Sequence, residues 1–195
     1  MMLPPAEHVH WLFATGFLLL GLCLLARAIV GDEVWSRRRW RAYLWPSLMF
    51  GLGLLMWPVM VFFTNSTIHM LAHGAWAQTM MLAGAAELGL VRGKLHHAAW
   101  RLAMPLALAV SGGALLLHEQ NDWLFSRAAF LHHALGWTAL VGALFPLIGA
   151  VRPRSRVWSS GFALTLLVIA VMLYADRDVA PIFGHLSPLA GEQHR

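Results

Sequence analysis

The chain has 195 residues, of which 59% are hydrophobic and only 12% are charged, with a formal net charge of +5 at pH 7. Soluble domains have about 25% charged residues, so this composition excludes an ordinary soluble protein and indicates an integral membrane protein. The basic residues fall in short connections between apolar segments, which excludes a nucleic-acid surface. The single cysteine, Cys23, excludes an internal disulfide and a multi-cysteine metal site.

Six apolar segments approach or reach the roughly 20 residues needed to cross a bilayer. They cover about residues 9–29, 43–63, 67–90, 102–119, 128–150 and 157–175. Segments in lipid satisfy their backbone hydrogen bonds as helices. The sequence therefore predicts an all-α fold, a polytopic bundle of six transmembrane helices forming one domain over residues 1–175. A polar C-terminal tail is expected over residues 176–195. The first ten residues have no basic region, so we expect the first segment to be a retained span and not a signal peptide.

The basic residues alternate between the two ends of these segments. Of the 14 Lys and Arg residues, five lie between residues 27 and 41, three between 92 and 101, and three between 152 and 156. Cytoplasmic connections are enriched in Lys and Arg. The sequence therefore predicts that the first, third and fifth connections are cytoplasmic and that both termini lie outside. Because the connections are short, we expect a bacterial inner membrane.

The third segment, residues 67–90, is the most polar of the six. Its His69 and His73 are four residues apart and share one face of a helix. Gln78 is suited to a hydrogen bond across helices. Glu87 lies roughly 20 Å from His73 along the helix, at the predicted cytoplasmic end. It is expected either to pair with a basic residue of the next connection or to relay protons.

Histidines gather at the predicted outer ends of the helices. Two lie near the start of the first segment, two near the start of the third, one at the end of the fourth and two at the start of the fifth. Seven of the 11 histidines thus converge on one level of the membrane. They are His8, His10, His69, His73, His118, His132 and His133.

Imidazole binds copper, zinc and haem iron, so the convergence of histidines predicts a transition-metal site, with copper or zinc as the ion. The predicted metal ligands are His69, His73, His118, His132 and His133. Glu119 or Asp122 would orient a ligand ring or bind directly. Met56 and Met60 add thioethers, which suit Cu(I), although methionine is also a common gap-filler between helices.

Three groups of residues also carry a family resemblance. An early histidine precedes a glycine-containing span and a basic loop. The third segment has histidine, glycine and a late acidic residue, and the fourth connection is acidic with a histidine on each side. The residues are His10, Phe13, Gly16, Gly21, Arg37 to Arg41, His73, Gly84, Glu87, His118, Glu119, Asp122, His132 and His133.

This pattern resembles the transmembrane protein 45 family, defined by domain of unknown function 716. The chain departs from it in lacking the first of two glycines in the third segment and a second histidine in the loop motif, where Gln120 lies nearby. It also has six predicted helices where family members commonly have seven. The resemblance implies a polytopic helical membrane protein and supports the histidine positions, but it implies no reaction.

Four functions remain open from the sequence. The first is a metal-binding membrane protein that works in metal handling or redox at the outer face. The second is a single-haem b-type cytochrome with axial histidines from two helices. The third is a zinc-dependent membrane hydrolase, and the fourth is a structural protein without a cofactor. No nucleophile or phosphate-loop motif is present, so the sequence does not decide whether the chain is an enzyme. The lipid bilayer is the partner it predicts.

Overall fold

The computed structural model describes residues 5–63, 67–117, 127–152 and 155–177, and every regular element among them is a helix. The elements are α1 (Ala6–Val30), α2 (Asp32–Ser36), α3 (Arg39–Phe63), α4 (Thr67–Val91), η1 (Ala98–Leu102), α5 (Ala103–Leu117), α6 (Arg127–Val151) and α7 (Arg156–Tyr174). The predicted all-α class is confirmed. The first basic connection contains the short helix α2, which the apolar pattern did not reveal.

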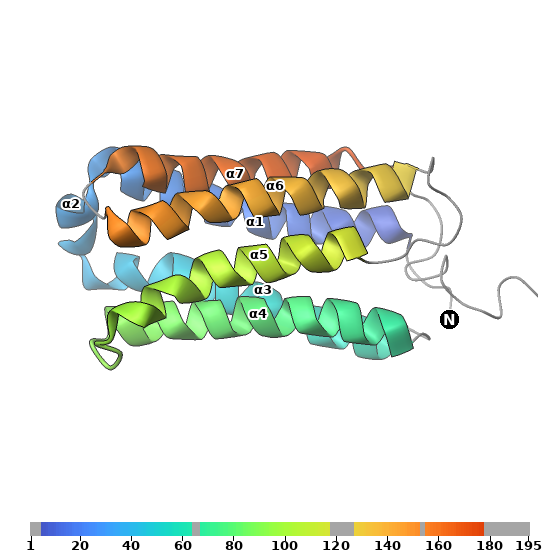
Figure 1. Ribbon diagram of the computed structural model, residues 1–195, viewed down its shortest axis with the longest axis horizontal. Coiled ribbons are helices and arrows are strands. Elements are labelled where there is room, and N and C mark those ends of the chain that lie inside the picture. The colour runs from blue at the N-terminus through green and yellow to red at the C-terminus, as the bar shows by residue number, and fades with distance from the viewer. Residues whose placement is uncertain (1–4, 64–66, 118–126, 153–154, 178–195) are drawn as a thin grey trace, which may run out of the picture.

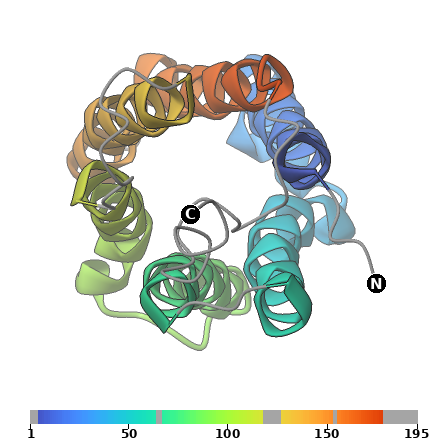
Figure 2. The same cartoon turned by 90° about the vertical axis from the view of Figure 1, so that its right-hand side faces the viewer.

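The six long helices run along one axis and form a closed ring (Figures 1 and 2). Their order around the ring is α1, α3, α4, α5, α6 and α7, and α7 packs against α1. Helices that follow each other in the chain are neighbours in the ring, as their short connections require. The ring encloses a central axis to which every long helix contributes side chains.

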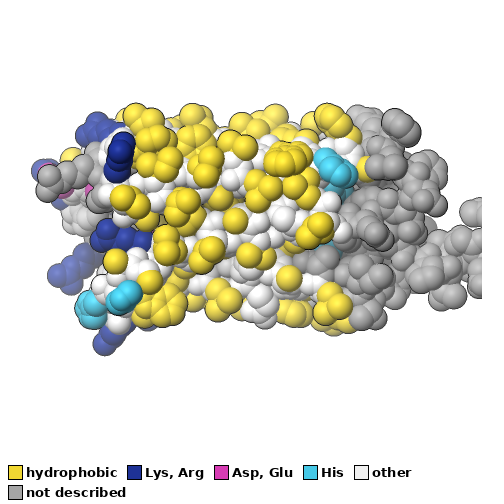
Figure 3. Space-filling view, viewed as in Figure 1, with side chains coloured by type: hydrophobic (Ala, Val, Ile, Leu, Met, Phe, Trp, Pro, Cys, Tyr) yellow, Lys and Arg dark blue, Asp and Glu magenta, His cyan; other side chains and the backbone are white. Residues whose placement is uncertain are grey.

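Among the residues that the structure describes, five helices are long and apolar enough to cross a membrane. They span Glu7–Val30, Arg39–Phe62, Ala98–Leu117, Ala129–Val151 and Arg156–Tyr174. Yellow, hydrophobic side chains cover much of the middle of the face in Figure 3, as lipid contact requires. The chain is therefore a multi-pass α-helical membrane protein. Helix α4 is as long as α1 and α3 but is not among the five, because its histidine, glutamine and glutamate residues make it more polar.

Glycines set several of the closest approaches between helices. A Cβ atom added at Gly84 of α4 would lie 2.6 Å from the backbone nitrogen of Phe50 on α3. One added at Gly112 of α5 would lie 2.7 Å from the carbonyl oxygen of Gly136 on α6. Small residues of this kind let membrane helices pack backbone against backbone, so these two helix pairs are held close along the ring.

The two ends of the bundle differ in charge. Lys and Arg side chains gather at the end that carries α2 and η1, shown in dark blue in Figure 3. Arg27 donates to the Asp32 carboxylate there, at 2.6 Å, and the Arg41 guanidinium lies 5.6 Å from the centroid of the Trp35 ring. Helices α1, α4 and α6 begin at the opposite end. That end carries the histidines considered next.

Candidate functional site

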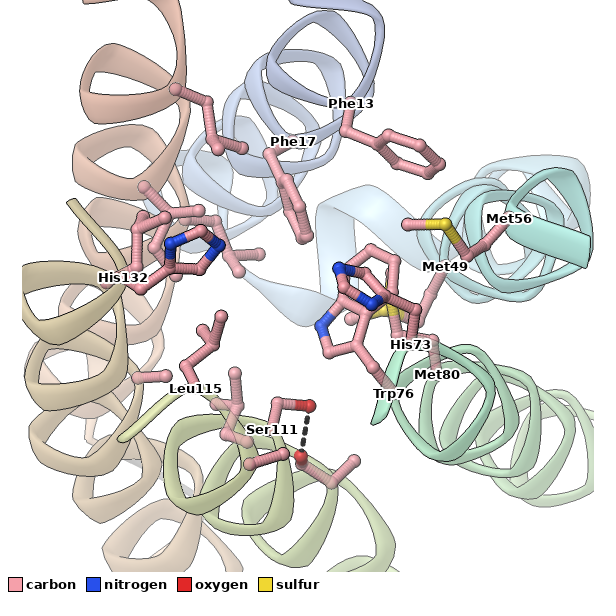
Figure 4. A pocket seen from close by; sticks show the side chains of 18 of the residues that line it. Phe13, Phe17, Met49, Met56, His73, Trp76, Met80, Ser111, Leu115 and His132 are labelled. Carbon is pink, nitrogen blue, oxygen red and sulfur yellow. Dashed lines mark hydrogen bonds between the residues drawn. The ribbon is translucent and has the colours of Figure 1, made fainter. Parts of the chain in front are cut away.

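A cavity of about 120 Å³ lies on the axis of the ring and is lined by all six long helices. Most of its walls are apolar. Three histidines line it, from α1, α4 and α6, together with four methionines from α3, α4 and α5. They are His10, His73, His132, Met49, Met56, Met80 and Met104. Figure 4 shows His73 and His132 projecting into the cavity from different helices, and Met56 lines the same cavity from α3. The cavity therefore combines imidazole nitrogens and thioether sulfurs.

The three histidines lie at one level of the bundle. His10 is four residues after the first residue of α1, His132 five after that of α6, and His73 six after that of α4. At 1.5 Å per residue, each is roughly 6 to 9 Å inside the end of its helix. Met104 is the second residue of α5 and Met49 the eleventh of the 25 residues of α3, so both line the cavity nearer to the basic end than the histidines do. The cavity is thus elongated along the axis, with imidazoles at the end opposite the basic residues.

His10 is held by a buried carboxylate from the other end of the chain. Its Nδ1 lies 2.5 Å from Oδ2 of Asp176, whose side chain is only 4% exposed. When Asp176 is ionised, its carboxylate only accepts hydrogen bonds, and Nδ1–H of His10 is then the donor. The indole N–H of Trp11 donates to the Asp176 carbonyl at 3.3 Å, and the Arg177 guanidinium lies over the Trp11 ring. The carboxylate contact fixes the imidazole orientation and leaves Nε2 as the other ring nitrogen.

The rings of His10 and His132 are neighbours at this level. Their ring centroids are 6.3 Å apart, and the rings are nearly perpendicular, at 73°. If two imidazoles bound one ion from opposite sides, with nitrogen–metal bonds of about 2.0 Å, their centroids would be roughly 6 Å apart. The observed spacing is compatible with a shared ion. His73 lines the same cavity from α4.

Of the five predicted metal ligands, the structure brings His73 and His132 to one cavity. The neighbouring His133 does not line it. Its side chain is exposed, and its Nδ1 lies 2.8 Å from the carbonyl oxygen of Ala129, one turn back on the same helix. Successive residues of a helix point about 100° apart, so only one of the two adjacent histidines reaches the axis.

The other two predicted ligands are not placed by their side chains. His69 is on α4, four residues before His73, but its side chain lies outside the described part of the structure. His118 lies outside the described residues, as do Glu119 and Asp122, which the sequence proposed as supporting groups.

The sequence did not select two residues that matter at this site. His10 was counted among the outer histidines but was not chosen as a ligand, and Asp176 was assigned to the tail. The signal available was the level of His10 on the first helix. The pairing of His10 with Asp176, 166 positions away, depends on the packing of α7 against α1. No local sequence pattern predicts this packing. Met56 lines the cavity as its predicted thioether role requires, whereas Met60 lies near Gly74 between α3 and α4.

The donor set limits the chemistry of the site. Within the described ranges, no three His, Cys, Asp or Glu side chains are grouped so that they could hold one metal ion. The donors that line the cavity are instead three imidazoles and four thioethers. Glu87 is remote from it, because it lies near the basic end, where Arg27 and Arg101 act on it electrostatically. The histidine site and the Glu87 carboxylate are therefore separate.

Comparisons with known proteins add no further information. No family model, no curated protein and no solved structure matches the chain.

Proposed function

We propose that this chain is a membrane protein that binds one copper(I) ion in the axial cavity and works in metal handling or redox. The main support for this proposal is that one cavity is lined by histidines from three different helices, together with methionine thioethers. These histidines are His10, His73 and His132. The proposed first ligands are Nε2 of His10 and a ring nitrogen of His132. Met56, which lines the same cavity, is the proposed further donor.

Copper fits this donor set better than zinc. Structural zinc sites take four nitrogen, oxygen or thiolate ligands in a tetrahedron, and the described residues supply no group of three such side chains. Thioether sulfur is a soft ligand that selects Cu(I). The side chains of His69 and His118 lie outside the described part of the structure, and both stay candidates for additional ligands. If they bind the ion, the site has enough nitrogen ligands for zinc.

A b-type haem is the second candidate, because His10 and His132 approach each other from two helices at a suitable spacing. The volume argues against it. The cavity of about 120 Å³ is smaller than the 300–1,000 Å³ or so that cofactor sites occupy. A haem would require the helices to separate, whereas a single ion would not.

The proposal includes the predicted topology. Six spans, with the histidine end and both termini outside and the basic end cytoplasmic, would place the ion at the level of the outer leaflet. The gathering of Lys and Arg at one end supports this orientation. A bacterial inner membrane is the proposed location. The likeness to the transmembrane protein 45 family stays a prediction and supplies no reaction.

The test is copper binding by the full chain, purified in detergent without chelator and loaded with Cu(I). We expect one copper per chain by elemental analysis. His132→Ala should lose the ion, and His133→Ala is the matched control that should retain it, because His133 is exposed and bonds its own helix. Equal copper contents in the two variants would refute the site. A Soret absorption band in the purified chain would show that the cavity binds haem and not copper.

A further inference from the structure

A stripe of exposed residues runs along the side of α4 that faces away from the axis. The residues that form this stripe are Leu71, Ala75, Gln78, Leu82 and Ala85. They recur at alternating spacings of four and three, the spacing of a helix-to-helix seam. The cavity-lining His73 and Trp76 lie on the opposite side of the helix. We call these five residues the Gln78 stripe.

Gln78 lies at the centre of its helix. It is the twelfth of the 25 residues of α4, between about 16 and 20 Å from the two ends. In a bilayer this is the middle of the hydrocarbon core, where a carboxamide finds no water. A polar group without a hydrogen-bond partner is costly there.

Two other exposed polar side chains on the helices satisfy themselves locally. The Thr15 hydroxyl donates to the Trp11 carbonyl at 2.8 Å, and the His133 ring bonds the Ala129 carbonyl. Gln78 carries the one carboxamide among the described residues. This side-chain amide forms no hydrogen bond with another described residue. Its amide has two donors and an acceptor, which a partner outside this bundle would satisfy.

We propose that the Gln78 stripe is the contact between two copies of this chain. Copies in one membrane share the same orientation, so a twofold axis along the membrane normal brings each stripe residue against its own counterpart. A carboxamide is complementary to itself, because it donates and accepts, and two Gln78 side chains pair reciprocally. Ala75 and Ala85, about one to two turns on either side, allow the backbones to approach closely.

The interface involves the outer side of α4 alone. It leaves the cavity, its histidines and the ring closure between α7 and α1 untouched, so it stands or falls independently of copper binding.

The first test measures the association of the full chain in lipid vesicles by energy transfer between labelled copies. The wild type is expected to be dimeric. Gln78→Leu should raise the dissociation constant roughly three- to tenfold, as expected for loss of a hydrogen bond between membrane helices. The matched control is Val168→Leu, which changes an exposed residue on α7 and should leave the constant unchanged. A monomeric wild type, or an unchanged constant in Gln78→Leu, would overturn the proposal.

The second test identifies the partner. In a Cys23→Ser background, Ala75→Cys keeps Gln78 in place and should form a disulfide in native membranes treated with an oxidant. The expected product has twice the 21.6 kDa mass of the chain, and adding Gln78→Leu should reduce its yield. Val168→Cys is the control and should give none. A product of any other mass would mean a different partner, and an absent product would mean no contact; either contradicts the proposed dimer.

Discussion

The contact between His10 and Asp176 gives the most specific prediction of the copper site. Asp176→Asn keeps the size and shape of the side chain but removes its charge. The carboxamide no longer guarantees an acceptor for Nδ1–H, because its NH₂ group competes for the same position. The variant therefore leaves the proposed ligand in place and loosens only the group that orients it.

The size of the effect follows from burial. The Asp176 side chain is 4% exposed and that of His10 is 27% exposed, so solvent screens little of their interaction. Hydrogen bonds to charged groups contribute about 1.5 to 3 kcal/mol. Loss of the partner of a ligating histidine weakens metal binding about 10- to 100-fold, which is about 1.4 to 2.7 kcal/mol. The two ranges agree, so we expect a loss of copper affinity of this size in Asp176→Asn.

The assay is competition for Cu(I) between the purified chain and a coloured chelator. Arg177→Ala is the matched control, because Arg177 adjoins Asp176 and contacts Trp11 but does not line the cavity. It should bind copper as the wild type does. Wild-type affinity in Asp176→Asn, with the helical content unchanged, would refute the idea that this carboxylate prepares His10 for an ion.

Three further predictions concern packing, pH and topology. Gly112→Val should lower the free energy of unfolding by about 1 to 3 kcal/mol, because its side chain would meet the backbone of Gly136. Gly113→Val, with nothing within 4 Å of its added Cβ, should cost less in the same detergent melt, and equal losses would contradict the close contact. Copper affinity should fall as the pH is lowered from about 8 to about 5, since an imidazole binds metal only when neutral; a flat profile would argue against imidazole ligands. In a background without the native cysteine, Asp122→Cys should react with an impermeant thiol reagent added outside and Arg38→Cys should not, and the reverse pattern would invert the proposed topology.

The helices could be predicted from the sequence because length and hydropathy define them directly. A run such as residues 128–150 is apolar for the length of a bilayer, and its backbone has no alternative to a helix in lipid. The short helix α2 escaped prediction because it is a polar, five-residue element in a basic connection. Its place depends on packing and not on periodicity.

The site could be predicted only in part, because the rotation of a membrane helix about its axis is poorly encoded. The lipid-facing and bundle-facing sides are both apolar, so no amphipathic stripe indicates which side faces inward. The sequence therefore offered His132 and His133 equally, and only the packed ring separates them. Spacing did relate His69 to His73 locally, but it gave no means of pairing His10 with Asp176.

The central claim is that one copper ion lies in the axial cavity between imidazoles and a thioether. X-ray absorption at the copper edge of the loaded full chain tests this most directly. The account predicts Cu(I) with the scattering pattern of at least two imidazoles and one sulfur neighbour at about 2.3 Å, taking zinc–sulfur bonds as the guide, and it predicts loss of the imidazole signal in a His10→Ala, His132→Ala double variant. A first shell of oxygen alone, or an unchanged spectrum in that variant, would contradict it.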